Sequence, residues 1–195
     1  ACLDLAMELL RPAPGRLVAI GGLSGSGKST VAAAIAHHVG AAPGARILSS
    51  DRIRKRIAGV APEIPLPPDS YTQESSDRVY ATLVAEAGHT LALGHACIAD
   101  AVFSRQEERR AIGHCAAEAG VPFHGIWLEA DPHTLVARVR GRRNDPSDAT
   151  EDVVLAQVRR HARPMGWHMV QAGTDGAATR AAVLAALGIP PEARG

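Results

Sequence analysis

The stretch Gly22-Leu23-Ser24-Gly25-Ser26-Gly27-Lys28-Ser29 matches the pattern G-x-x-x-x-G-K-[ST]. Its glycines let the backbone bend so that several N–H groups point into one concavity, and the start of the following helix favours negative charge there. Lys28 would neutralise the β and γ phosphates of a nucleoside triphosphate, and the Ser29 hydroxyl would bind Mg²⁺. We therefore expect a Walker A loop that binds ATP with magnesium through Gly22, Leu23, Ser24, Gly25, Ser26, Gly27, Lys28, Ser29 and Thr30.

The residues on either side support this interpretation over a chance match in a glycine-rich loop. The apolar run Leu17-Val18-Ala19-Ile20 predicts a buried strand before the loop. Val31, Ile35 and Val39 recur every four residues and predict a helix after it, which Gly40 ends. A dinucleotide-binding loop is a weaker alternative, because no G-x-G-x-x-G fits here.

Strands and helices alternate along the rest of the chain. We expect further strands at residues 46–50, 95–100, 121–128 and 167–171, and a proline-rich surface loop at residues 59–70. The expected helices cover residues 52–58, 79–91, 105–119, 131–143, 150–161 and 175–187. Such alternation predicts an α/β fold in which a parallel sheet carries helices on both faces.

The bulk composition is that of an ordinary globular domain. The chain has 195 residues, of which 46% are hydrophobic and 21% charged, and its formal net charge of +1 argues against a broad nucleic-acid or membrane surface. Three cysteines without a C-x-x-C pair suggest reduced thiols. No apolar run approaches the roughly 20 residues that span a bilayer, and no secretory signal is visible, so we expect a cytoplasmic protein.

Asp51 and Arg54 are the first candidates for chemistry beyond nucleotide binding. Asp51 follows a predicted strand, and open α/β sheets place their ligands at the carboxyl ends of strands. Its carboxylate could accept the proton of an acceptor hydroxyl, and Arg54, one helical turn later, could face the same cleft. A simpler alternative, equally weighted, is that Ser50 or Asp51 caps the helix at residues 52–58.

A second acid and a group of arginines are weaker signals. Cys97-Ile98-Ala99-Asp100 has the form of a Walker B strand, with Asp100 holding Mg²⁺ directly or through water, or merely ending a strand at a turn. The arginines would form a lid over the transferring phosphates, or simply complement a helix dipole. They are Arg138, Arg140, Arg142 and Arg143.

Together these stretches resemble the small P-loop kinases related to gluconate kinase, polynucleotide 5′-kinase, chloramphenicol phosphotransferase and zeta toxin, and most of all the predicted kinases of the AAA_33 type. The resemblance spans most of residues 16–188 and rests on residues 22–30, 50–56, 98–103 and 138–148. It implies a P-loop NTPase fold, three-layer α/β/α, with a five-stranded parallel sheet of order 2-3-1-4-5. One departure is Val102-Phe103, where related chains often carry Thr-Asn or Thr-Phe.

The resemblance also implies roles for single residues and a division of the chain. Asp51 would be the base, Arg54 would contact phosphate or substrate, and Arg138 or Arg142 would be the lid arginine at the ATP phosphates. Residues 1–15 are expected to be a linker or the end of a preceding segment, 16–188 the kinase domain and 189–195 a tail. Domains of this type are sometimes fused behind an aminoglycoside-phosphotransferase-like domain, so fusion to another domain is expected for the full-length chain.

Two classes of function follow from the sequence. The favoured one is an ATP-dependent phosphotransferase acting on a hydroxyl of a small molecule or, less favoured, of an oligonucleotide; the sequence does not name the acceptor. The alternative is a nucleotide-binding switch or regulatory ATPase without an acceptor. Nine histidines show no zinc spacing and are expected to be solvated or structural.

Overall fold

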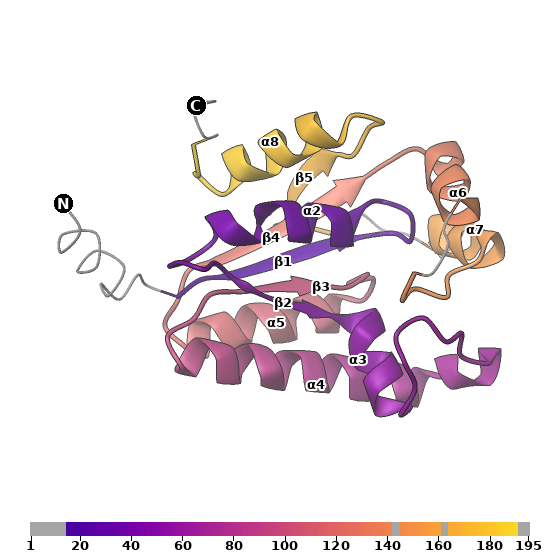
Figure 1. The fold of residues 1–195 in the computed structure, drawn as a ribbon, viewed down its shortest axis with the longest axis horizontal. Helices are drawn as coiled ribbons and strands as arrows, with labels where there is room; N and C mark the ends of the chain where they lie inside the picture. The colour runs from indigo at the N-terminus through magenta and orange to yellow at the C-terminus, as the bar shows by residue number, and fades with distance from the viewer. Residues whose placement is uncertain (1–14, 142–144, 161–163, 191–195) are drawn as a thin grey trace.

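The computed structural model describes residues 15–141, 145–160 and 164–190. Five parallel strands form one sheet in the order β2-β3-β1-β4-β5, which confirms the expected topology (Figure 1). The strands are β1 (Leu17–Gly22), β2 (Arg46–Ser49), β3 (Cys97–Asp100), β4 (Phe123–Glu129) and β5 (His168–Gln171).

Three of the helices begin after a residue whose side chain binds their first free backbone N–H groups. Thr72 accepts a hydrogen bond from the N–H of Ser75, and Asp131 and Asp175 do the same at two later helices. The helices are α2 (Lys28–Ile35), α3 (Ser50–Ile57), α4 (Gln73–Ala92), α5 (Gln106–Glu118), α6 (Pro132–Arg140), α7 (Glu151–Arg160) and α8 (Gly176–Ala186), with 3₁₀ turns η1 (Ala36–His38) and η2 (Pro68–Tyr71).

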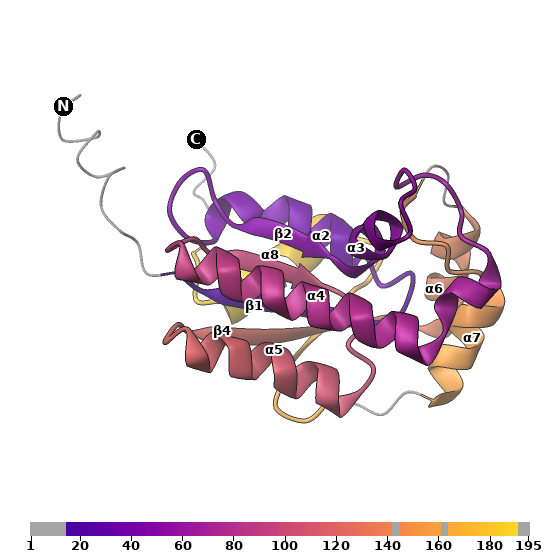
Figure 2. The same ribbon diagram turned by 90° about the horizontal axis from the view of Figure 1, so that it is seen from below.

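Helices cover both faces of the sheet and create two apolar layers. Helices α2 and α8 lie on one face, where Val18, Ile20 and Ile98 pack against Ile35 and Val183. Helices α4 and α5 lie on the other face, as Figures 1 and 2 show from two directions. The central strand β1 is buried along its whole length, so the loop that follows it starts from a rigid support.

Several expected boundaries differ from the observed ones by a few residues, and two of these differences bear on the site. The α-helix after the glycine-rich loop ends at Ile35 and not at Gly40, because the carbonyl of Ala36 accepts from the N–H groups of Val39 and Ala45 and the chain turns there. Strand β2 ends at Ser49, and α3 begins at Ser50, so Asp51 lies in the first turn of a helix and not at the end of a strand.

Three helices lie beyond the carboxyl edge of the sheet. Helix α3 follows β2 directly, while α6 and α7 follow β4, and all three appear on the right of Figure 1, where the strands end. Leu135, Val139 and Val154 on α6 and α7 are buried in the same apolar cluster as β1 and β3. The carboxyl edge is therefore enclosed by packed helices, which is where ligands of parallel sheets bind.

Tryptophan packing explains two glycines on neighbouring strands. A Cβ atom on Gly125 would lie 2.7 Å from ring atoms of Trp167, and one on Gly21 would lie 2.8 Å from rings of both Trp127 and Trp167. By contrast, a Cβ on Gly113 in α5 would lie 3.6 Å from the Phe123 ring, an ordinary contact. The sheet thus has no room for a methyl group beneath Trp167.

We expect Gly125→Ala to lower the free energy of unfolding by about 1–3 kcal/mol, because overpacking forces the Trp167 ring to shift. Gly113→Ala is the matched control and should leave stability unchanged or raise it by up to about 1 kcal/mol, since alanine is the better helix former. Urea unfolding followed by tryptophan fluorescence measures both. A Gly125→Ala protein as stable as the wild type would contradict the packing described here.

Candidate functional site

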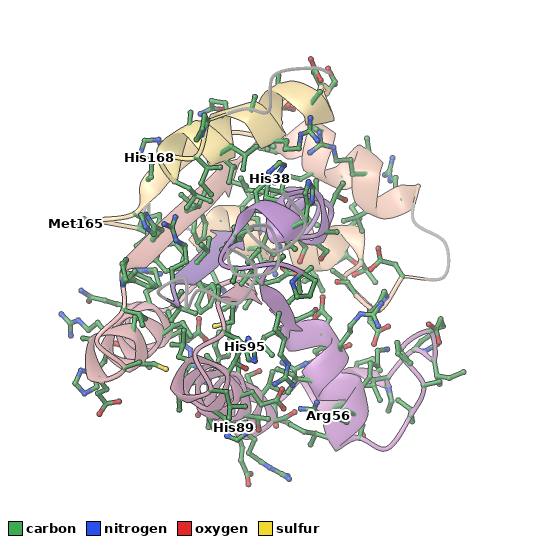
Figure 3. The ribbon with its side chains drawn as sticks, turned by 60° about the vertical axis from the view of Figure 1, so that its left-hand side comes forward. His38, Arg56, His89, His95, Met165 and His168 are labelled. Carbon is green, nitrogen blue, oxygen red and sulfur yellow. The ribbon has the colours of Figure 1, made fainter. Side chains whose placement is uncertain are left out.

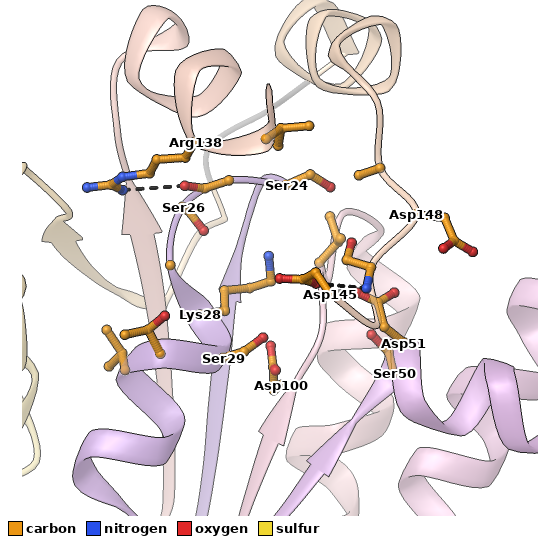
Figure 4. Close-up of a pocket in the computed structure, with 18 of the residues that line it drawn as sticks. Ser24, Ser26, Lys28, Ser29, Ser50, Asp51, Asp100, Arg138, Asp145 and Asp148 are labelled. Atoms are coloured by element: carbon orange, nitrogen blue, oxygen red, sulfur yellow. Dashed lines mark hydrogen bonds between the residues drawn. The ribbon is translucent and has the colours of Figure 1, made fainter. Parts of the chain in front are cut away.

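A cleft of about 1500 Å³ lies at the carboxyl edge of the sheet. Its floor is the loop between β1 and α2, and its walls come from α3, the 63–71 segment, α6, α7 and the start of α8. Figure 4 shows this arrangement, with Arg138 at one end and Asp51 and Asp148 at the other. The cleft brings together residues from most of the sequence. Of the site residues expected from the sequence that lie within the described ranges, all except Gly22, Leu23 and Arg140 line it directly.

The phosphate loop, residues 22–30, has a backbone shape that requires glycine. Gly25 and Gly27 have φ angles of 88° and 90°, in the left-handed region that side chains disfavour. A Cβ on Gly25 would lie 2.5 Å from the carbonyl oxygen of Leu135, so α6 approaches the loop as closely as a glycine permits. Gly27 directly precedes α2, and residues 27–30 line the cleft, so the start of this helix, with its free N–H groups, lies at the cleft.

One buried polar atom in the phosphate loop has no hydrogen-bond partner among the described residues, the hydroxyl oxygen of Ser26. Ser26 is only 1% exposed. A buried hydroxyl without a partner is costly, so an external group that accepts or donates a hydrogen bond at this point would stabilise the site. The shape of the loop and this hydroxyl both fit a bound phosphate.

Lys28 and Ser29 of the phosphate loop lie close to Asp100 of the neighbouring strand β3 (Figure 4). The Lys28 Nζ donates to the carbonyl oxygen of Leu23 at 3.1 Å, which folds the side chain back over the loop. Asp100 ends β3 and pairs in register with Ile20 of β1, and its side chain is 3% exposed. In Figure 4 its carboxylate lies next to the Ser29 hydroxyl, so two oxygen donors suited to Mg²⁺ adjoin each other.

The position of Asp51 removes one of the two sequence interpretations. Ser49 is the N-cap of α3 and makes no side-chain cap bond, whereas Ser50 and Asp51 are the first and second residues of the helix. The capping alternative for these two residues is therefore wrong, although a carboxylate in the first turn still favours the helix dipole. Figure 4 shows Asp51 across the cleft from Lys28.

Arg54 lies on the same wall but is turned toward α4. Its guanidinium donates to the hydroxyls of Ser75 at 2.9 Å and Ser76 at 3.3 Å, and its central carbon lies 4.9 Å from the centre of the Tyr71 ring. These partners are neutral, so the positive charge of Arg54 remains available at the cleft wall.

The arginine cluster separates into different environments. Arg138 lies over the phosphate loop and donates to the backbone carbonyls of Gly25, Ala172 and Gly173. Arg140 instead forms an ion pair with Glu151, which joins α6 to α7 outside the cleft. Arg142 and Arg143 lie outside the described residues, and Arg138 is thus the arginine of the cluster that the structure brings to the phosphate loop.

A buried lysine is a feature that the sequence interpretation missed. Lys55 is 1% exposed, and its Nζ donates to the carbonyl of Ile64 at 2.5 Å and to both carboxylate oxygens of Asp148 at 2.7 and 2.6 Å. Asp148 also accepts from the N–H of Leu66 at 2.9 Å and from the hydroxyl of Tyr71. We call these contacts of Asp148 with Lys55, Leu66 and Tyr71 the Asp148 clasp.

The contacts of the Asp148 clasp shift the pKa values of Asp148 and Tyr71 in opposite directions. Burial alone would raise the pKa of Asp148, but hydrogen bonds from Lys55, Tyr71 and Leu66 outweigh burial and hold it below the usual value. Burial and the adjacent Asp148 carboxylate raise the pKa of Tyr71, so its hydroxyl stays protonated and keeps donating. The clasp ties the 64–71 segment to the segment before α7 across one end of the cleft.

The histidines do not form a metal site within the described part of the chain. No group of three His, Cys, Asp or Glu side chains that could hold a metal ion occurs there. Figure 3 shows His38 and His168 well apart from His89 and His95. The two described cysteines, Cys97 and Cys115, are buried free thiols, and burial raises the pKa of Cys97 to about 12.

Among the residues that the structure describes, no helix combines the length and the apolar composition needed to cross a bilayer.

Comparison with protein families and curated proteins gives two kinds of match. The model of the AAA_33 family, described as an AAA domain, matches residues 17–164. An uncharacterized protein of Mycobacterium tuberculosis is 30% identical over 164 residues, which cover 82% of this chain and 32% of that protein. The adenylyl-sulfate kinase of Myxococcus xanthus is 30% identical over 122 residues, 60% of this chain and 59% of that enzyme. The chain therefore spans about a third of the length of the first curated relatives it matches.

Solved structures of kinases share the fold. A gluconokinase from Sinorhizobium meliloti 1021 superimposes with a TM-score of 0.61 at 22% identity, over 90% of this chain and 92% of that one. The APS kinase of Mycobacterium tuberculosis, in complex with AMPPNP and APS, gives a TM-score of 0.65 at 18% identity, over 90% and 98% of the two chains. At these identities the likeness establishes the fold of a P-loop kinase and nothing finer.

We expect Asp148→Asn to lower the free energy of unfolding by about 3 kcal/mol near neutral pH, because the buried Lys55 ammonium loses its counter-charge. The pKa of Asp148 is depressed in the folded protein. The stability that its carboxylate contributes is therefore complete above the usual carboxyl pKa of about 4 and is lost as the pH falls through the folded pKa. Urea unfolding of wild type and variant should therefore give a stability difference that narrows toward about pH 2.

The control is the double variant Lys55→Met/Asp148→Leu, which removes both charges. It should lose less stability than the sum of the two single changes, since no unpaired buried charge is left. Additive losses, or a gap between wild type and Asp148→Asn that does not depend on pH, would contradict the role given to the Asp148 clasp.

Proposed function

Because the chain belongs to the AAA_33 family, we propose that it is an ATP-dependent phosphotransferase that moves the γ-phosphate of ATP·Mg to a hydroxyl of a small molecule. The observation that carries the proposal is the single cleft in which a phosphate loop and a carboxylate, Asp51, face each other from different elements. A phosphotransferase needs a phosphate cradle and a base at opposite ends of one enclosed space.

The nucleotide end of the cleft fits ATP and Mg²⁺. The phosphates would be bound by the backbone N–H groups of residues 25–29, the Lys28 ammonium and the Ser26 hydroxyl, which has no hydrogen-bond partner in the described part of the chain. Ser29 and Asp100 would hold Mg²⁺, which commonly takes only one or two protein ligands and completes its shell with phosphates and water. When bound, the ion supplies charge that neutralises the phosphate oxygens.

Arg138 would act at the same end of the cleft. Its three backbone contacts join the phosphate loop to the segment after β5, residues 172–174, which lines the cleft beyond the loop. We propose that it holds the nucleotide from that side and positions the phosphates, in place of a freely swinging lid. Arg142 lies outside the described residues, and its role as a lid arginine stays a proposal.

The acceptor end would supply the base. The Asp51 carboxylate would accept the proton of the acceptor hydroxyl as that oxygen attacks the terminal phosphate, and the Arg54 guanidinium would orient a phosphate oxygen or a substrate oxygen. Asp51 is not the N-cap of α3 and its side chain lines the cleft, which supports a polar role there beside its effect on the helix dipole. Lys28 would stay with the transferred phosphoryl group throughout.

The shape of the acceptor end favours a small acceptor over an oligonucleotide. The Asp148 clasp joins the 64–71 segment to the segment before α7 and crosses this end of the cleft. A polynucleotide needs an open basic groove along which its phosphates can run. Among the described residues, α3 and the segments at 63–71 and 145–150 contribute Asp51, Glu63 and Asp148 to the lining but only one arginine, Arg54. The other arginines that line the cleft, Arg138 and Arg180, come from α6 and α8. The adenylyl-sulfate kinase of Myxococcus xanthus, by its name, also acts on a small molecule.

An acceptor screen tests the proposal and its alternative together. ADP release from ATP·Mg is followed with and without a panel of metabolites and antibiotics, and hits are checked for the mass of one added phosphate. An acceptor that stimulates the rate and gains phosphate supports the phosphotransferase. ADP release that no acceptor changes would support a regulatory ATPase or switch.

We expect Asp51→Asn to lower acceptor phosphorylation by a factor of about 10²–10⁴ while the affinity for ATP·Mg stays near normal, because the base acts on the acceptor and not on the nucleotide. Asp100→Asn should instead raise the Mg²⁺ concentration needed for half-maximal rate. Both are measured as rates over a Mg²⁺ series, with nucleotide affinity from calorimetry.

Lys28→Ala serves as the control for nucleotide binding and should bind ATP poorly while keeping the thermal stability of the wild type. An Asp51→Asn enzyme with full activity would remove Asp51 from the mechanism and with it the main reason to prefer a phosphotransferase over a switch.

A further inference from the structure

Gln157 of α7 contacts the phosphate loop directly. The backbone N–H of Ser24 donates to its side-chain oxygen Oε1 at 2.9 Å, across 133 residues of sequence. Gln157 also lines the cleft. Gln157 therefore links α7 to the phosphate loop. No local sequence pattern predicted this contact.

The packing of α7 holds Gln157 at this position. Val154, one turn earlier, is fully buried in the core, and Val158 packs against the same cluster. The ion pair between Arg140 and Glu151 joins the start of α7 to α6. A helix anchored at 151, 154 and 158 cannot rotate freely, so Gln157 is presented to the loop in one register.

The chemistry of the contact fixes which end of the amide meets the loop. A backbone N–H can only donate, so the oxygen of Gln157 must face Ser24 and the NH₂ group must project away from it. Among the described residues Nε2 makes no hydrogen bond. An NH₂ group beside a phosphate loop is a donor to an anionic oxygen, a role that a carboxylate could not take.

The positions of Arg138 and of Ser24 at different ends of the phosphate loop indicate which phosphate the Gln157 NH₂ group would contact. Arg138 and residues 172–174 mark the end of the loop opposite Asp51. Ser24 and the Lys28 Nζ, which binds the carbonyl of Leu23, lie on the side toward Asp51 in Figure 4. A triphosphate whose reacting end faces Asp51 would bring its last phosphate to the Ser24 side of the loop.

We infer that Gln157 recognises the terminal phosphate of the bound nucleotide, with Oε1 held by the Ser24 N–H and Nε2 donating to a γ-phosphate oxygen. The inference rests on the proposed nucleotide binding. This contact would make α7 selective for a nucleoside triphosphate, because ADP has no phosphate oxygen at the γ position for Nε2 to bind. The competing account is that Gln157 only braces α7 against the loop, for which Oε1 alone would suffice.

Binding measurements separate the two accounts without an acceptor. The dissociation constants of AMPPNP and ADP are measured by calorimetry, both with Mg²⁺, on the wild-type chain, on Gln157→Met and on Gln157→Glu. Gln106→Met is the matched control, since Gln106 is exposed at the start of α5 and does not line the cleft. Thermal unfolding of each nucleotide-free protein shows whether α7 is still in place.

Gln157→Met should weaken AMPPNP about tenfold, the fold-change expected for one hydrogen bond to a charged group, and leave ADP within about twofold. Gln157→Glu keeps an oxygen for the Ser24 N–H but places a negative charge by the phosphate, so it should fold like the wild type and weaken AMPPNP more than Gln157→Met does. Gln106→Met should change neither constant.

Three results would overturn the inference: equal losses for AMPPNP and ADP in Gln157→Met, wild-type AMPPNP affinity in Gln157→Glu, or a wild-type chain that binds neither nucleotide. The last result would also remove the proposed function. Selective loss of AMPPNP in the variants, without any phosphorylated acceptor in the screen, would support Gln157 as the selector and reject the phosphotransferase alone.

Discussion

The backbone of the phosphate loop is the constraint on which the rest of the structure depends. Gly25 and Gly27 hold left-handed φ angles, and at Gly25 the carbonyl of Leu135 leaves no space for a side chain. The loop can keep this shape only because β1 beneath it is fully buried and α6 packs on top of it. Its N–H groups are therefore oriented before any ligand arrives, and phosphate binding needs little rearrangement of the backbone.

The cleft is assembled by pairing elements that are distant in sequence. The register of β1 with β3 brings Asp100 beside Ser29, and the short step from β2 into α3 places Asp51 at the opposite side. The Asp148 clasp and the Gln157 contact then attach the segment from 148 to 157 to both sides, one to α3 and one to the phosphate loop. Residues 148–157 thus bridge the proposed acceptor and nucleotide ends, as the proposed function would require of a segment that contacts both substrates.

Much of the fold could be predicted because its signals are local. The loop motif, the apolar runs of the strands and the spacing of Val79, Leu83, Ala87 and Leu91 on α4 each depend on neighbouring residues, and the structure confirms the elements they predicted. Lys55 and Gln157 could not be found in this way. Lys55 sits in a basic run that resembles an exposed helix, and its partner Asp148 is 93 residues away. The Ser24 contact of Gln157 depends on how α7 packs, which no short pattern encodes. The roles given to the site residues from the family resemblance stay predictions.

The central claim is that the phosphate loop binds the nucleotide on one side of the phosphoryl group to be transferred, while Asp51 lies on the other side, where the acceptor would bind. A crystal structure of the chain grown with Mg²⁺ and AMPPNP tests it most directly. The account predicts the β and γ phosphates over the N–H groups of residues 25–29, Mg²⁺ between the Ser29 hydroxyl and the Asp100 carboxylate, and the terminal phosphate on the side of Asp51. A nucleotide bound elsewhere, or with its phosphates pointing away from Asp51 toward residues 172–174, would contradict the account.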